Sequence, residues 1–91
     1  MSGSLHVFRR DVVNGEPLYQ INYNLTGRTF AKVLDRDDLE EFLAVTAALP
    51  DDVVAAAIRE VDDTGKAHIL DVKISEGEVA GHGMLETPSE F

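Results

Sequence analysis

The sequence has no cysteine and no tryptophan, and its 91 residues include only 8 Lys and Arg against 17 Asp and Glu. Without cysteine the chain forms no disulfide, offers no thiolate nucleophile and cannot bind zinc through sulfur. The formal net charge of −9 argues against nucleic acid as a partner, because phosphate binding depends on Lys and Arg. It argues equally against an anionic membrane surface.

Long hydrophobic runs are also missing. The most apolar segments, 39–50 and 53–58, are too short to cross a bilayer, and the first residues lack the basic and apolar regions of a signal peptide. We therefore expect a cytoplasmic protein, and the lack of cysteine fits that compartment. The length and a hydrophobic content of 44% predict one globular domain over 5–85, with a disordered N-terminus at 1–4 and a flexible tail at 86–91.

Two alternating segments, 5–13 and 18–25, flank Asn14-Gly15, a strong β-hairpin signal because both residues tolerate positive φ. A loop of two residues and a loop of four differ by a register shift of two, so both keep the same residues on one face. That face is expected to be the core side of the sheet: His6, Phe8, Val12, Tyr19, Ile21, Tyr23 and Leu25. The other face is expected to be the interaction surface, with four aliphatic residues among polar ones: Leu5, Val7, Val13 and Leu18.

Two helices are expected in the middle of the chain. Asp35 is a good N-cap whose carboxylate can accept from the Asp38 amide, and apolar residues then recur at helical spacing up to Leu49. A second helix is expected to start at Asp51, with Gly65 as the left-handed residue after its C-terminus.

The order of these elements predicts the fold class. With a third strand over 28–34 and a fourth over 66–75, the order is β-β-β-α-α-β, and a short fifth strand can follow. Strands grouped in blocks favour an α+β fold with a small, mostly antiparallel sheet. Two helices packed on one face bury their apolar stripes and leave the other face of the sheet bare.

The chain has three histidines, His6, His68 and His82. No two of them have the spacing of a metal site, so we expect no metal and no cofactor. His6 and His68 come into contact if the fourth strand lies beside the first. His82 lies between two glycines, where an exposed imidazole titrates near neutral pH, so it is the best candidate for a ligand-binding or acid–base group.

The acids are concentrated in the second half of the chain. Residues 51–91 have a net charge of −7, whereas residues 1–50 have −2. One acidic patch is expected from five residues: Asp51, Asp52, Glu60, Asp62 and Asp63. Asp62 and Asp63 lie at the predicted C-terminal end of a helix, where the dipole disfavours negative charge.

Together these features favour a non-catalytic protein-interaction or self-associating module, with a partner protein or a homodimer bound on the bare face. Two alternatives stay open. One is a small ligand binder or enzyme that uses the His82 loop, and the other is an acidic mimic of nucleic acid that docks a basic protein. No catalytic residue is predicted.

Overall fold

Five strands and four helical segments make up the computed structural model, which describes residues 2–81 and 83–87. The strands are β1 Gly3–Val13, β2 Glu16–Leu25, β3 Arg28–Asp35, β4 Lys66–Val72 and β5 Leu85–Thr87. The helical segments are α1 Arg36–Glu41, η1 Phe42–Thr46, α2 Asp51–Thr64 and α3 Glu76–Gly81. All strand pairs are antiparallel and the spatial order is β4-β1-β2-β3-β5. The predicted α+β class is confirmed, and α3 is an additional helix where the sequence predicted a turn and a loop.

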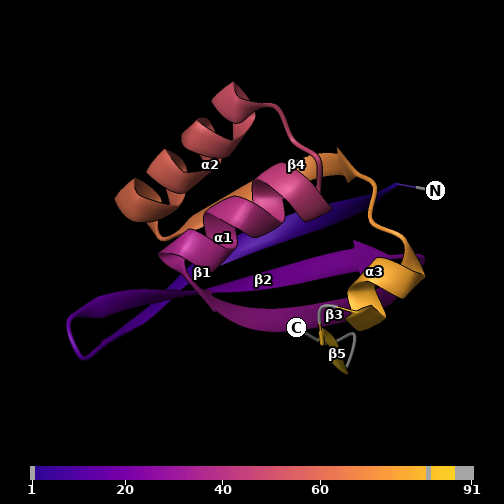
Figure 1. Ribbon diagram of the computed structural model, residues 1–91, viewed down its shortest axis with the longest axis horizontal. Coiled ribbons are helices and arrows are strands. Elements are labelled where there is room, and N and C mark those ends of the chain that lie inside the picture. The colour runs from indigo at the N-terminus through magenta and orange to yellow at the C-terminus, as the bar shows by residue number, and fades with distance from the viewer. Residues whose placement is uncertain (1, 82, 88–91) are drawn as a thin grey trace.

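The helical layer of α1, η1 and α2 covers one face of the sheet (Figure 1). Leu39, Leu43 and Val61 from these segments are completely buried against it. The short helix α3 lies near the end of the sheet where β2 ends and β3 begins (Figure 1). Over the described residues, no helix is long and apolar enough to cross a membrane.

Local signals place the helix ends as the sequence predicted. The Asp35 carboxylate accepts from the Asp38 amide at 2.8 Å, and Gly65 ends α2 with φ of +88°. In η1 the Ala47 amide donates to the Phe42 carbonyl at 2.9 Å. That five-residue spacing makes η1 a π-helical turn, which widens the helix before Pro50.

A β-bulge in β1 decides which face of the hairpin is buried. Next to the turn, Val13 pairs with Glu16, as a two-residue loop requires. Between Arg9 and Val12 the register shifts by one residue, so that Arg9 lies opposite Tyr19. Because side chains alternate with a period of two, a register shift of one residue moves the side chains of β1 before the bulge to the other face of the sheet.

The predicted faces of β1 are therefore wrong. Leu5 and Val7 are completely buried under the helical layer and cannot belong to an exposed interaction surface. His6 and Phe8, predicted to be in the core, are half-buried on the opposite face of the sheet. The sequence argument considered register shifts of two residues, whereas a bulge shifts the register by one.

The prediction for β2 is confirmed, since its predicted core residues are all buried: Tyr19, Ile21, Tyr23 and Leu25. Of the other residues assigned to the hairpin faces, Val12 is 54% exposed and Leu18 is half-buried. The side chain of Val13 lies outside what the structure describes.

A second irregularity turns the end of β4. Asp71 has a positive φ of 59°, so the strand changes face between Ala67 and Val72, which are both buried. His68 and Leu70 are consequently exposed, although regular alternation over 66–75 would put them on the same face as the buried Val72.

The last described residues belong to the sheet. β5 pairs with β3 from Thr29 to Ala31, and the Arg28 guanidinium lies 2.9 Å from the Glu86 carboxylate. Glu86 and Thr87 were expected to belong to a flexible tail, and this pairing corrects that boundary. Residues 88–91 lie outside the described residues.

Candidate functional site

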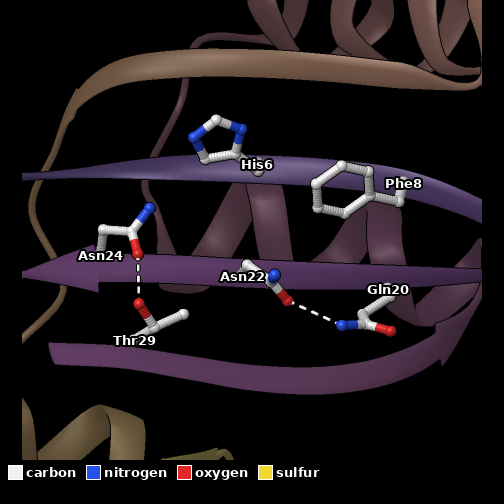
Figure 2. Close-up of a pocket in the computed structure, with 6 residues that line it drawn as sticks. All are labelled: His6, Phe8, Gln20, Asn22, Asn24 and Thr29. Carbon is white, nitrogen blue, oxygen red and sulfur yellow. Dashed lines mark hydrogen bonds between the residues drawn. The ribbon is translucent and has the colours of Figure 1, made fainter. Parts of the chain in front are cut away.

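The open face of the sheet is the surface opposite α1 and α2. A hollow of about 360 Å³ lies on it, over β1, β2 and the start of β3 (Figure 2). We call this feature the open-face hollow, and its lining residues are His6, Phe8, Gln20, Asn22, Asn24 and Thr29.

One side of the hollow is a row of aromatic rings. His6 and His68 are cross-strand partners on β1 and β4, and their rings stack with centroids 3.9 Å apart and planes 17° apart. The Phe8 ring lies 6.0 Å from that of His6 and is almost parallel to it. In stacked imidazoles the ring nitrogens lie in two parallel planes, so the nitrogens of His6 and His68 do not converge on one metal position. Within 2–81 and 83–87, no group of three metal-ligating side chains is found.

Burial and the adjacent His68 imidazole lower the pKa of His6 below its ordinary value of 6.5. The unfolded chain therefore binds a proton at His6 more readily than the folded chain does. The resulting contribution to stability is present above about pH 6.5 and is lost as the pH falls towards the lower pKa of the folded state. At neutral pH the ring is uncharged and offers one acceptor nitrogen and one N–H donor.

Replacing His68 with Gln is expected to raise the pKa of His6 while leaving it below 6.5. The replacement removes the electrostatic effect of the second imidazole, but burial, which is the larger cause, remains. NMR titration of the His6 ring measures the shift. Arg59→Gln on α2 is the control, because it changes a charge on the other side of the sheet. An equal shift of the His6 pKa in both variants would contradict the assignment of this effect to the His68 imidazole.

The other side of the hollow is a row of amides on β2. The Arg10 guanidinium donates to the Gln20 Oε1, and Gln20 Nε2 donates to Asn22 Oδ1 at 2.8 Å. The Thr29 hydroxyl donates to Asn24 Oδ1 at 2.5 Å. These bonds occupy the amide oxygens and present the side-chain nitrogens of Asn22 and Asn24 to the hollow as donors (Figure 2).

Charge is divided between the two faces of the molecule. Within the described ranges 4–8, 18–24, 29–33 and 66–68, no Asp or Glu stands on the open face, and Arg10 and Lys66 lie at its border. The helical layer has four acids in α1 and five in α2. The centre of the open face is therefore free of acids within these ranges, and Glu16 and Asp35 lie at its end next to the turn between β1 and β2.

The five residues of the predicted acidic patch are divided between the two ends of α2. Asp51 and Asp52 lie in its first turn, about 16 Å along the axis from the acids of its last turns. Asp62 is also engaged, since its carboxylate accepts from the Tyr19 hydroxyl at 2.8 Å and from Arg36 at 3.0 Å. These partners explain an acid at a helix C-terminus. The other predicted site residue, His82, lies outside the described residues.

Sequence reasoning recovered half of this site. It predicted that the amide side chains at positions 20, 22 and 24 lie on the face opposite the buried tyrosines. It placed Leu5 and Val7 on that same face, whereas the structure has His6 and Phe8 there. The regular alternation of three amides on one strand was the available signal. A polar row of this kind marks an exposed face, and it could have been used to test the register of β1.

Comparison of the chain with family models, curated proteins and solved structures gives no match. The functional argument for this protein therefore rests on the chemistry of its own residues.

Proposed function

We propose that the chain is a non-catalytic binding module that self-associates through its open face, with a second copy of the chain as the occupant. The observation that carries the proposal is the division of charge, since the centre of the open face, within the described ranges 4–8, 18–24, 29–33 and 66–68, has no acid in a chain of net charge −9. Two copies that meet by their open faces keep the acids of α1 and α2 on the outside of the assembly. The expected compartment is the cytoplasm, in keeping with the lack of cysteine.

The open face is also self-complementary. In a two-fold dimer the same patch of each copy meets its equivalent. The nitrogens of Asn22 and Asn24 are donors, and the uncharged ring of His6 offers an acceptor nitrogen. Donors of one copy can therefore meet acceptors of the other, and the half-buried Phe8 adds apolar contact area.

The size of the face limits the affinity. Four strands about 4.8 Å apart, with about 20 Å of length each, cover roughly 400 Å². A standard protein interface buries about 800 Å² on each partner. We therefore expect a weak, reversible dimer with a dissociation constant of roughly 10–100 μM.

The variant Asn24→Asp is expected to weaken the dimer at least about tenfold. A carboxylate still accepts from the Thr29 hydroxyl, but it replaces a donor with a negative charge and brings like charges together across the two-fold axis. Sedimentation equilibrium at neutral pH, up to high micromolar concentration, measures the dissociation constant of each protein.

The matched control is Asn14→Asp, which makes the same charge change in the hairpin turn. Asp tolerates the left-handed backbone found there, where φ is +52°. This control should dimerise like the native chain. A native chain that stays monomeric at high micromolar concentration, or equal weakening in both variants, rejects self-association through the open face.

A second candidate function is the binding of a small planar ligand, which the volume of the open-face hollow favours. Sites for small molecules have volumes of about 300–1,000 Å³, and this one lies at the lower end of that range. Benzamide is a suitable probe, because its ring can stack on Phe8 while its oxygen accepts from Asn24. Saturable NMR shifts of the Asn22 and Asn24 side-chain amides support the candidate, and their absence rejects it.

A further inference from the structure

The outer edge of β3 is only partly covered. β5 pairs with it from Thr29 to Ala31, and across 2–81 and 83–87 no strand pairs with the stretch from Lys32 to Asp35 on that side. A groove of about 240 Å³ runs beside this stretch, between β3 and the outer side of α1 and η1. Among the described residues, the stretch from Lys32 to Asp35 is thus the unpaired part of the edge with which β5 pairs.

The turn between β2 and β3 fixes which backbone groups face this edge. Thr26 and Gly27 have φ of +50° and +79°, which is typical of a two-residue hairpin loop whose closing pair exchanges two hydrogen bonds. Because bonded and non-bonded pairs alternate, Thr29, Ala31 and Val33 direct their N–H and C=O groups away from β2. β5 covers the first two of these residues. The N–H and C=O groups of Val33 are the next outward-facing backbone groups along the same edge.

The groove has an apolar floor and an acidic rim. Leu34 and Phe42 are buried at its floor, and Val45 is 70% exposed beside them. Asp38 and Glu41 on α1 are exposed at its rim, and one cation, Lys32 of β3, also lines it, so the charged side chains of the groove have a net charge of −1. An extended segment that binds here would place one apolar side chain on the floor, and its side chains two positions before and after, which share that face, would meet the carboxylates.

We propose that this edge binds an extended basic segment of a partner protein by strand addition. The segment pairs its backbone antiparallel with Val33, in line with β5, and packs an apolar residue on Leu34 and Val45. Lys or Arg side chains two positions before and after that residue share its face and lie beside Asp38 and Glu41, so the charges of the two partners are complementary. The proposal uses the backbone edge of the sheet and does not rest on self-association through the open face.

The probe is a short synthetic peptide with the pattern Lys-Thr-Val-Thr-Lys, blocked at both ends, which places Val and both Lys side chains on the same face of an extended strand. It is titrated against the full chain and its binding is followed by fluorescence anisotropy. Two further peptides have N-methyl groups on every second residue, in the two opposite phases, and keep the same charge. One phase blocks strand pairing and should weaken binding at least about tenfold, whereas the other should bind like the unmodified peptide. Equal affinity for all three peptides overturns the proposal, because charge alone would then explain binding.

Variants of the protein test the same contacts. Val33→Pro removes only the outward N–H, which an edge strand tolerates, and should weaken binding about fivefold. The double variant Asp38→Asn with Glu41→Gln should also weaken it. Asp37→Asn with Glu40→Gln makes the same charge change on α1 outside the groove and is the control. Equal losses of peptide affinity in both double variants overturn the proposal. If Val33→Pro does not fold, the N-methyl peptides test backbone pairing in its place.

Discussion

The Val7→Asp variant is expected to lose about 3–5 kcal/mol of its free energy of unfolding at room temperature and neutral pH. Val7 is completely buried beneath the helical layer, where it lies opposite Ile21. An unpaired carboxylate in that apolar layer destabilises the folded state by about 3–5 kcal/mol or is protonated at a similar cost. Total stabilities of small domains are about 5–15 kcal/mol, so this single change removes much or all of the stability. Far-UV circular dichroism and urea unfolding measure the effect.

The adjacent variant, Phe8→Asp, is the matched control and should fold. Phe8 is half-buried on the open face, so its replacement loses only part of the apolar burial of one side chain, about 1 kcal/mol. The new carboxylate stays in contact with water. If Phe8→Asp unfolds and Val7→Asp does not, the bulge in β1 and the assignment of the two faces are wrong.

The second large effect is expected for Tyr23→Phe, which should lower the free energy of unfolding by about 2–4 kcal/mol. The Tyr23 ring is completely buried, and its hydroxyl donates to the Val72 carbonyl at 2.9 Å. The same oxygen accepts from the Ile74 amide at 3.2 Å. Phenylalanine fills the same space but leaves a buried carbonyl and a buried amide without their partner. Urea unfolding gives the change in stability.

Tyr19→Phe serves as the comparison for Tyr23→Phe. The Tyr19 hydroxyl donates to the partly exposed Asp62 carboxylate, which keeps Arg36 and water as partners after the change. We expect a loss of about 1 kcal/mol there. In Tyr23→Phe, but not in Tyr19→Phe, hydrogen exchange at the Ile74 amide should accelerate selectively. Equal losses in the two variants, without that selective exchange, would contradict a special role for the Tyr23 hydroxyl.

The features that the sequence predicted correctly are determined by neighbouring residues. The N-cap at Asp35 depends on an amide three residues away, and the helix end at Gly65 depends on one residue that accepts a positive φ. The turn at Asn14-Gly15 is equally local. Each of these can be derived from a window of a few residues, so no knowledge of the rest of the fold was needed.

The face of β1 could not be derived in that way. Leu5 and Val7 form one apolar set and His6 and Phe8 form another, and both sets alternate correctly. The choice between them depends on which set the distant helices cover, and a single bulged residue exchanges the two. The candidate site was therefore predicted in part, with the correct amides on β2 and the wrong side chains on β1.

Helix α3 was missed for a different reason, and the short fifth strand was predicted without its residues. α3 has two glycines in six residues, a composition that does not favour a helix, and β5 has only three residues. Tertiary contacts hold both, since Val79 is buried and Glu86 is paired with Arg28. Local propensity does not predict elements that owe their existence to packing.

The bulge also has a consequence for how the chain folds. If the two strands pair outward from Asn14-Gly15 without the bulge, the hairpin adopts a register that is shifted by one residue. In this slipped register His6 and Phe8 are on the same face as the buried side chains of β2. We expect this register to compete with the native one early in folding and to unzip before the helices dock. Protonated histidines are costly to bury, so mild acid raises the energy of the slipped hairpin more than that of the native one. The His6 imidazole on β1 is therefore expected to disfavour the slipped register in mild acid.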